Sequence, residues 1–262
     1  MENTMRSPLG FIGAGSLTNF VTTGLCTSAN PLSGILIADI VPSRTAAIVA
    51  KFPAQISIAE NNQSLIDACD TVLLAIRPID TALVLKDLRF RPEQTVISVI
   101  ALKTLADLEN LVAPCQNIVR VMPMPPVQEH LGTIPYYPQN QQVQSILERL
   151  AQPLLMQTEE DLNVITAVTG LLAPFYLLLD YAVSWAVEHG VRPDTAQTFT
   201  VNMFHSLAEM SRKPGTELKE MIREAATPGG LNEQSTKFLA MSGAYEPFLT
   251  VLEDLLKRIT TK

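Results

Sequence analysis

The stretch GFIGAGSLT, which begins at Gly10, constrains the fold more than any other part of the chain. It places Gly13, Gly15 and Thr18 at the spacing G-x-G-x-x-G/A, directly after a strand-like run and before a helix-like segment. The first glycine allows a tight turn, the second lets the main chain approach a pyrophosphate, and the amides of the following helix face its negative charge. We expect Thr18, in place of the third glycine, to loosen helix-to-strand packing without removing the phosphate site. The motif predicts dinucleotide binding; a doubly wound fold that keeps only the glycine turn is the alternative.

Short apolar or β-branched runs alternate with helix-like segments from Pro8 to about Pro153. This alternation is typical of strand-helix units around a parallel sheet that is buried on both faces. The expected strands are LGFIG, GILIAD, DTVLLAI, QTVISVI and NIVRVM, and the expected helices cover residues 17–28, 43–52, 63–68 and 105–112. We therefore predict an α/β Rossmann domain, with a doubly wound and mainly parallel sheet, over residues 1–158.

Asp39 ends the second expected strand and lies 24 residues after Gly15. An acidic side chain at this place can bond the adenosine ribose hydroxyls, and it would repel a ribose 2′-phosphate. NADH is therefore favoured over NADPH. Ser43 and Arg44 lie just beyond and could turn toward a phosphate, so the cofactor preference stays open.

Two further loops follow expected strands, at the sheet edge where ligands bind in such folds. In AIRPID, Arg77 either touches the cofactor phosphates or is a solvated loop cation. In VMPMPP, the prolines from Pro123 to Pro126 predict a stiff, extended wall, which suits a ligand pocket or a domain linker. The expected cofactor-binding residues are Gly13, Ala14, Gly15, Ser16, Leu17, Asp39, Ala75, Arg77 and Pro78.

After residue 158 the pattern becomes helical, and we predict a helical dimerisation and substrate domain over residues 159–262. The expected helices cover residues 162–188, 194–211, 216–225, 232–239 and 246–259. The segment from Val164 to Val187 is apolar enough to resemble a membrane span, but it contains Pro174 and Asp180 and has no basic flank. We expect it to lie at the centre of a dimer instead.

Composition excludes several classes of function. A net charge of -7 without clustered lysine and arginine disfavours a nucleic-acid partner. Three widely separated cysteines, Cys26, Cys69 and Cys115, indicate buried reduced thiols rather than disulfides. No metal-binding spacing and no secretory signal are visible, so we expect no metal, no membrane and a cytoplasmic location.

The order of GFIGAG, AIRP, VISVI, RVMPMPP, AVTG before a long apolar helix, and TPGG resembles the pyrroline-5-carboxylate reductase family from Leu9 to about Ala244. The resemblance implies an NAD(P)H-dependent oxidoreductase of proline biosynthesis that reduces the C=N bond of a cyclic imine. It also implies a helical domain that interlocks two subunits as a homodimer, with each active site completed across that dimer.

The chain departs from the family where the family is polar. Met124 and Pro125 replace Asn-Thr, Leu171 and Leu172 replace small polar residues, and Asn232 replaces a threonine that in the family donates to the bound imino acid. An apolar wall rejects a substrate that needs those hydrogen bonds. We therefore expect an altered, less polar substrate.

The loop TPGGLN, Thr227 to Asn232, precedes a helix expected from Leu231 or Asn232. Its two glycines and the free amides of the helix suit a small carboxylate beside the nicotinamide. The alternative is a helix C-cap followed by an N-cap. The expected catalytic residues are Asn232 and Thr227, and the expected substrate-binding residues are Gly229, Gly230, Leu231 and Met124.

Four interpretations stay open at this stage. His130 either donates a proton or has a plain surface or packing role, and Lys103 either contacts a ligand or is solvated. A hydroxy-acid dehydrogenase would share the first domain, but its lysine or histidine base belongs on the helical domain, whose longest helix has no lysine. A non-catalytic nucleotide-binding dimer is the remaining alternative.

Overall fold

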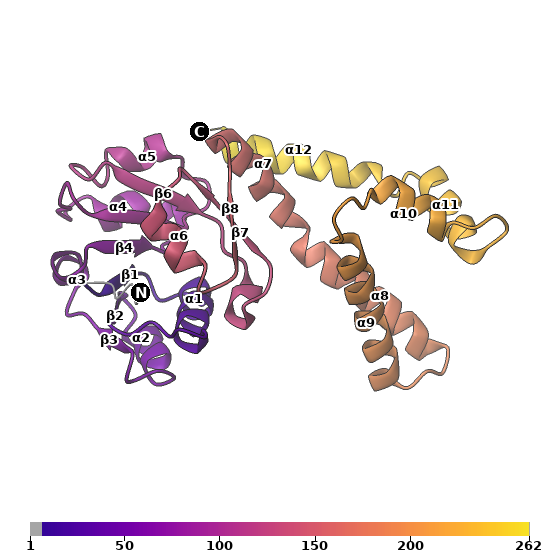
Figure 1. The fold of residues 1–262 in the computed structure, drawn as a ribbon, viewed down its shortest axis with the longest axis horizontal. Coiled ribbons are helices and arrows are strands. Elements are labelled where there is room, and N and C mark those ends of the chain that lie inside the picture. Colours follow the sequence, from indigo (N-terminus) through magenta and orange to yellow (C-terminus); the bar gives the residue numbers. More distant parts are fainter. Residues whose placement is uncertain (1–6, 262) are drawn as a thin grey trace. The chain divides into compact units, whose positions relative to one another are not determined.

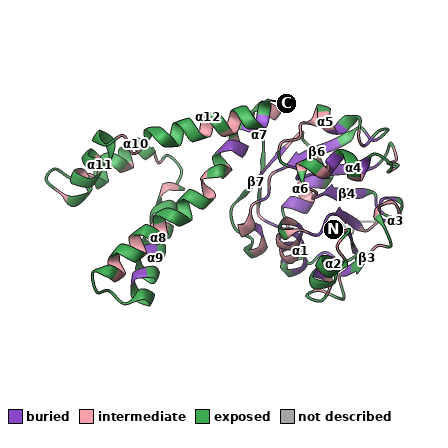
Figure 2. Ribbon diagram, turned by 180° about the vertical axis from the view of Figure 1, so that it is seen from behind, coloured by how far each residue is buried: buried purple, intermediate pink, exposed green. Residues whose placement is uncertain are grey.

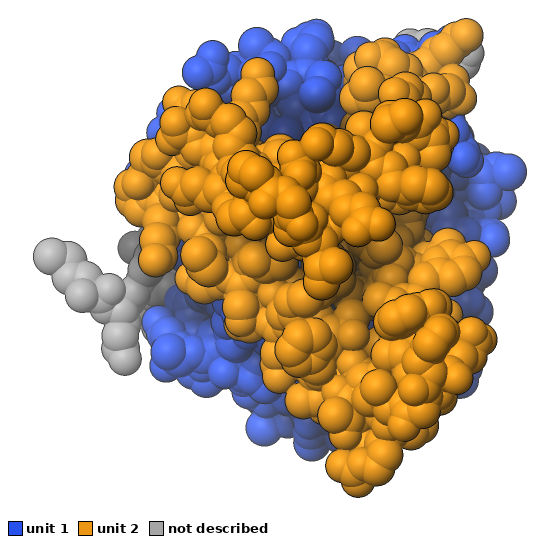
Figure 3. All heavy atoms as spheres, turned by 90° about the vertical axis from the view of Figure 1, so that its right-hand side faces the viewer, with its two compact units in different colours: residues 1–166, 258–262 blue, residues 167–257 orange. Residues whose placement is uncertain are grey.

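The computed structural model describes residues 7–261 and contains two compact units. Unit 1 comprises residues 1–166 and 258–262, and unit 2 comprises residues 167–257 (Figure 3). This division falls inside a helix that begins at Glu159. It differs from the boundary expected after residue 158, which stays a prediction.

Unit 1 is built on an eight-stranded sheet with the order β3-β2-β1-β4-β5-β6-β7-β8 (Figure 1). All neighbouring strands are parallel except β6 and β7, which are antiparallel. The strands are β1 Leu9–Ile12, β2 Ile35–Ala38, β3 Ile56–Ile58, β4 Thr71–Leu74, β5 Thr95–Ser98, β6 Asn117–Val121, β7 Thr133–Tyr137 and β8 Gln152–Leu155. The five predicted strands are confirmed, and so is the mainly parallel sheet.

Three strands escaped the sequence analysis for identifiable reasons. β3 has only three residues, and β7 contains Pro135. The four residues of β8 do not alternate between apolar and polar, and none of them is buried. Proline lacks the amide that a central strand uses, so a proline within a run argues against a strand. The antiparallel β7 has β6 on one side and β8 on the other, which extends the sheet beyond the parallel core.

Helices cover both faces of this sheet. They are α1 Ser16–Thr27, α2 Pro42–Val49, α3 Asn62–Ala68, η1 Pro78–Asp80, α4 Thr81–Leu85, α5 Leu105–Glu109, η2 Pro125–Glu129 and α6 Gln141–Leu147. Phe11 and Ile12, adjacent on β1, belong to two different buried clusters, one containing Leu25 of α1 and the other Leu65 of α3. Side chains of a strand alternate between faces, so this split means that both faces are buried. Figure 2 shows the central strands, such as β4 and β6, as buried elements.

The remaining chain is helical, as predicted. It forms α7 Glu159–Val168, η3 Thr169–Leu171, α8 Leu172–Glu188, α9 Pro193–Ser211, α10 Leu218–Ala225, α11 Leu231–Met241 and α12 Glu246–Thr260. The expected long helix over 162–188 is interrupted by the 3-10 turn η3. Pro174 has no amide to bond the carbonyl of Gly170, which accounts for the altered turn at this point.

Large apolar side chains are exposed along the helices of unit 2, which are mostly exposed in Figure 2. They include Phe175, Tyr181, Trp185, Phe199 and Phe238, each at least 45% exposed. By length and composition alone, one helical stretch within residues 7–261, Glu159–Glu188, is long and apolar enough to cross a membrane. Many large exposed apolar side chains on neighbouring helices indicate a region that contacts another molecule.

Candidate functional site

The glycine turn lies at the carboxyl end of β1, where the strand order of the sheet reverses. β1 pairs with β2 on one side and with β4 on the other, which is the switch point at which such sheets bind ligands. Gly13 has φ of +101°, and a Cβ built on it would lie 2.3 Å from the carbonyl oxygen of Ala75, which follows β4. Only glycine fits this position, because both the backbone conformation and the close approach exclude a side chain.

Thr18 stabilises the turn and does not loosen it, which corrects the expectation from the motif. The side chain is completely buried, and its hydroxyl donates a 2.6 Å hydrogen bond to the carbonyl oxygen of Gly13. A third glycine would make no such bond. The threonine therefore fills the space between helix and strand while it holds the glycine turn.

The start of α1 fits the phosphates of a dinucleotide. Gly15 caps this helix, and a Cβ built on it meets nothing within 4 Å, so open space lies directly in front of its main chain. The first amides of a helix have no partners within it and carry the positive end of its dipole. Ser16, the first helical residue, is exposed and Leu17 is half-buried. Open space and free amides at a helix start are features that suit a pyrophosphate, and its binding at this turn stays a prediction.

Asp39 lies beside the turn and is anchored by two backbone amides. Its Oδ2 accepts from the amide of Ala14 at 2.7 Å, and its Oδ1 accepts from the amide of Val41 at 2.8 Å. A fixed negative charge therefore adjoins the glycine turn, while Ser43 and Arg44 on α2 are exposed.

Arg77 follows β4 at the same edge of the sheet and caps η1, which starts with Pro78. Its side chain is 80% exposed, and its Nε lies 2.6 Å from Oδ2 of Asp80. This hydrogen bond and the charge of Asp80 raise the pKa of the guanidinium above its ordinary value. The structure thus shows an exposed cation with a partner, and its contact with cofactor phosphates stays a prediction.

The proline-rich segment after β6 is not the extended wall predicted from the sequence. Pro125–Glu129 form the 3-10 helix η2, and Met124, its N-cap, is extended. Proline suits the first positions of a helix, because its φ is already helical and no amide is needed there. η2 packs closely on α1: a Cβ on Gly24 would lie 2.5 Å from the carbonyl oxygen of Val127.

The contacts of His130 favour its packing interpretation. Nε2 lies 3.2 Å from the hydroxyl of Thr27 at the end of α1, and Nδ1 lies 3.2 Å from the carbonyl oxygen of Arg149 after α6. Both ring nitrogens therefore tie η2 to its neighbours. Lys103 is half-buried beyond β5, and both interpretations of its role stay predictions.

The TPGG loop connects α10 to α11, and α11 begins at Leu231 as expected. Gly229 has φ of +75°, and a Cβ on Gly230 would lie 2.7 Å from Oγ1 of Thr227 and 3.0 Å from its carbonyl oxygen. The turn itself therefore requires both glycines. Thr227 is exposed, Leu231 is 85% exposed, and Asn232 donates a 3.4 Å hydrogen bond to the carbonyl oxygen of Ala225.

A carboxylate is already bonded to this loop, and it belongs to the chain. Oε2 of Glu233 accepts from the amide of Gly229 at 2.8 Å, and Oε1 lies 2.7 Å from Nζ of Lys237. The bond from Lys237 and then the bond from Gly229 lower the pKa of Glu233. Sequence reasoning missed this residue, although a glutamate in the first turn of a helix is a recognisable signal.

A buried ion pair secures β6, the strand that leads to Met124. Arg120 is 3% exposed, and its Nη1 lies 2.6 Å from Oε1 of Glu159 and 2.9 Å from Oδ1 of Asn163. The same glutamate oxygen accepts from the amide of Leu105 at 2.8 Å. The cluster joins β6, α5 and α7, and no short-range pattern could have revealed it.

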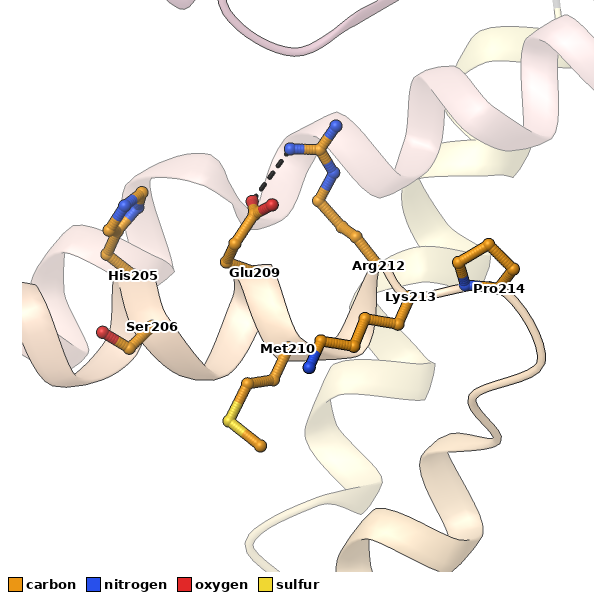
Figure 4. Close-up of a pocket in the computed structure, with 7 residues that line it drawn as sticks. All are labelled: His205, Ser206, Glu209, Met210, Arg212, Lys213 and Pro214. Atoms are coloured by element: carbon orange, nitrogen blue, oxygen red, sulfur yellow. Dashed lines mark hydrogen bonds and ion pairs between the residues drawn. The ribbon is translucent and has the colours of Figure 1, made fainter.

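A depression in the described chain lies elsewhere, at the end of α9 (Figure 4). It encloses about 500 Å³ and is lined by His205, Ser206, Glu209, Met210, Arg212, Lys213 and Pro214. Arg212 is paired with Glu209 at 2.9 Å, and none of the predicted site residues lines the depression. Because one exposed helix end supplies most of its lining, it does not enclose a small ligand.

Two family models match the chain. Residues 8–102 match NADP oxidoreductase coenzyme F420-dependent, and residues 159–261 match pyrroline-5-carboxylate reductase dimerisation. The first match spans the glycine turn, Asp39 and Arg77, and the second spans the TPGG loop. The helical part is therefore the dimerisation domain of that family.

Curated relatives match over most of their length. A pyrroline-5-carboxylate reductase of Pseudomonas aeruginosa is 27% identical over 250 residues, which cover 91% of this chain and 91% of the relative. Pyrroline-5-carboxylate reductase 1 of Bacillus spizizenii is 26% identical over 97% of this chain and 88% of its own.

Solved structures share the fold. Pyrroline-5-carboxylate reductase from Streptococcus pyogenes superposes with a TM-score of 0.86 at 21% identity, over 98% of this chain and 99% of its own. The Plasmodium falciparum pyrroline carboxylate reductase, solved with NADP bound, has a TM-score of 0.84 at 19% identity, with 97% of each chain covered. Both units thus have counterparts along the whole chain, in the order that the motifs predicted, and the chain belongs to the pyrroline-5-carboxylate reductase family.

Proposed function

We propose that this protein is an NAD(P)H-dependent reductase that transfers hydride to the C=N bond of a cyclic imine. The observation that carries the proposal is the open cradle at Gly15, at the switch point of the sheet, in a chain that also has the dimerisation domain of imine-reducing relatives. Bound NAD(P)H supplies the hydride.

On the cofactor side, the main chain does most of the binding. We propose that the turn from Gly13 to Leu17 holds the pyrophosphate through the amides of Gly15, Ser16 and Leu17. The amides of Gly13 and Ala14 shape the turn instead, because they already donate to Ala38 and Asp39. Ala75 and Pro78 would border the cofactor beside the turn, and Arg77 would meet its phosphates by leaving Asp80. Asp39 would accept from the ribose hydroxyls with the lone pairs that its two amide partners leave free.

On the substrate side, we propose that the TPGG loop supplies the contacts. The hydroxyl of Thr227 and the amide of Asn232 would donate hydrogen bonds that orient the ring, while Gly229, Gly230 and Leu231 form the wall against which it rests. Met124 would add an apolar contact. An iminium carbon is already electrophilic, so orientation rather than a strong protein acid is what these residues need to supply.

The apolar replacements favour a less polar substrate than that of the relatives. Leu171 and Leu172 stand at the junction of η3 and α8, and Leu231 opens α11 with its side chain exposed. A buried polar group without a partner costs about 1–3 kcal/mol. An imine ring with more hydrocarbon surface avoids that cost, and on this basis proline biosynthesis is the inherited role from which the protein diverged.

The assay is oxidation of NADH and NADPH by the purified homodimer in the presence of pyrroline-5-carboxylate and of bulkier cyclic imines. Turnover of any of these imines with saturation kinetics supports the proposal. Cofactor binding without turnover of any imine would overturn it in favour of a non-catalytic nucleotide-binding dimer. Turnover of hydroxy acids alone would point to the dehydrogenase alternative.

We further propose that NADH is the preferred cofactor. The Asp39 carboxylate is anchored beside the turn by two amides and would repel a 2′-phosphate, at about 4 kcal/mol for a separation of 4 Å and an effective dielectric of 20. Asp39→Asn removes the charge and keeps one acceptor oxygen, so it should lower the ratio of kcat/KM for NADH to that for NADPH by roughly tenfold or more. An unchanged ratio would show that Asp39 does not set the preference.

We propose that the apolar surface of α8 and α9 is buried in a cytoplasmic homodimer and does not enter a membrane. The match of residues 159–261 to the dimerisation family supports this assignment. Light scattering after size-exclusion chromatography without detergent should give twice the mass of 28.6 kDa for one chain. Recovery only with detergent would contradict it.

A further inference from the structure

Leu102 has a backbone conformation that amino acids with a side chain rarely adopt. It lies in the segment between β5 and α5, residues 99–104, which we call the Leu102 turn, and its φ is +62°. In the left-handed region Cβ lies too close to the following carbonyl oxygen, so leucine occupies this region about tenfold less than its ordinary conformation. Such a conformation persists only where the surrounding structure holds it.

Both ends of the Leu102 turn are bonded to other elements of unit 1. Where the turn leaves β5, the amide of Val99 donates to the carbonyl oxygen of Leu74 on β4 at 3.2 Å. Where it enters α5, the amide of Leu105 donates to Oε1 of Glu159 at 2.8 Å. The capping box of α5 is formed within that helix, whereas Glu159 belongs to α7. Glu159 therefore ties the far end of the turn to a distant part of the chain.

Glu159 is itself fixed by a buried partner. Its Oε1 lies 2.6 Å from Nη1 of Arg120 on β6, and the same Nη1 donates to Oδ1 of Asn163 at 2.9 Å. Arg120 and Asn163 are both buried. Breaking such a pair would leave a buried charge without its partner, which is costly, so the carboxylate keeps its place. The position of β6 is thus passed through Glu159 to the Leu102 turn.

The Leu102 turn lies at the edge of the sheet where ligands bind in this fold. β4 and β5 are parallel neighbours with Leu74 paired to Ser98, so their carboxyl ends lie side by side. A sheet of this type has two mononucleotide-binding halves, one on each side of its switch point. Under the proposed function Asp39, after β2, takes the adenosine half of the cofactor. The half made of β4, β5 and β6 is therefore left for the nicotinamide.

We propose that Glu159 is a positioning residue for the nicotinamide end of the cofactor. Through the amide of Leu105 it keeps the Leu102 turn left-handed, and the turn borders the nicotinamide. This inference rests on the cofactor site of the proposed function and deepens it. Glu159 touches neither cofactor nor substrate. The groups that contact the ring are the half-buried side chain of Leu102 and the main chain of its turn.

The size of the effect follows from the conformation of the turn. Without the bond from Leu105 to Glu159, the turn relaxes, and only a fraction of the protein keeps it left-handed. The apparent Kd is the intrinsic Kd divided by the fraction that is competent to bind. For leucine this fraction falls to roughly a tenth, so Kd should rise about tenfold. Glycine in place of Leu102 adopts both conformations about equally, which limits the rise to about twofold.

The experiment measures the Kd of NADH and of ADP-ribose by calorimetry for the full-length protein and its variants, each folded by circular dichroism. ADP-ribose is the cofactor without its nicotinamide. Glu159→Ala should raise the Kd of NADH about tenfold and that of ADP-ribose less than about twofold. Adding Leu102→Gly to Glu159→Ala should return the Kd of NADH to within about twofold of that of Leu102→Gly alone. Leu102→Ala is the matched control, because it keeps a Cβ and should not restore binding in the same background.

Two results would overturn the inference. If Glu159→Ala weakens NADH and ADP-ribose by the same factor, Glu159 only stabilises the fold. If Leu102→Ala restores binding as well as Leu102→Gly does, backbone strain is not the cause. Glu159→Gln keeps the volume and one acceptor oxygen, so it should give the same order with smaller changes, and it decides the question if Glu159→Ala does not fold.

Failure of the proposed function gives a different result. A wild type that binds NADH but reduces no imine refutes the reductase proposal, and the Kd values of NADH and ADP-ribose still decide the role of Glu159. Reduction of an imine together with equal changes in both Kd values refutes the role of Glu159 alone.

Discussion

Gly15→Asp should abolish cofactor binding and leave the fold intact. Gly15 has φ of -79° and ψ of -172°, a conformation open to any residue, and a Cβ there meets nothing within 4 Å. Aspartate is also a better N-cap than glycine. The free energy of unfolding should therefore change by less than about 0.5 kcal/mol, or rise slightly.

The effect on binding follows from charge. The new carboxylate would face the two phosphates of the cofactor, and each pair of charges roughly 4 Å apart costs about 1 kcal/mol in water and about 4 kcal/mol at an effective dielectric of 20. Even the lower value, summed over both phosphates, gives about 2 kcal/mol, which raises Kd roughly 30-fold. Gly15→Asn adds the same volume without the charge and should retain more affinity.

The measurement is a fluorescence titration with NADH for the wild type and both variants, with urea unfolding of each in parallel. An unchanged Kd for Gly15→Asp would refute the cofactor site. Equal losses in Gly15→Asp and Gly15→Asn would show that volume rather than charge is decisive, which contradicts the phosphate cradle.

Three further outcomes can be checked. Gly230→Val places a Cβ 2.7 Å from Oγ1 of Thr227 and so disturbs the TPGG loop. KM for the imine should rise about tenfold, while the Kd of NADH stays the same. Identical kinetics of variant and wild type would show that this loop does not contact the substrate. Glu159→Ala leaves the buried Arg120 without its ion-pair partner and should lower the free energy of unfolding by about 3 kcal/mol. The control Glu160→Ala removes an exposed glutamate and should change this free energy by less than about 0.5 kcal/mol. Equal effects of the two variants in urea unfolding would contradict the stabilising role of the ion pair. The three cysteines are buried and free, and burial raises the pKa of Cys26 and of Cys69 to about 11. A thiol reagent should therefore label none of the three in the native protein at neutral pH and all three after unfolding. Rapid labelling of the native protein would show that the thiols are accessible.

The sequence determined the features that depend on short segments. The turn at Gly13, the start of α11 at Leu231 and the change from β-branched runs to helices near Glu159 all have local causes: a positive φ that glycine allows, a glycine at the N-cap and a helical period. Such causes act within a few residues, so they are readable without a structure. The order of these motifs was sufficient to indicate the family.

Only the tertiary structure decided how distant residues share their hydrogen bonds. Thr18 proved to hold the glycine turn from within the core, Asp39 proved to be anchored by the amide of Ala14, and Arg120 found its partner in Glu159, 39 positions away. These outcomes depend on which groups the fold brings within about 3 Å of one another, and a hydrogen bond acts only at that range, so no pattern along the chain encodes them.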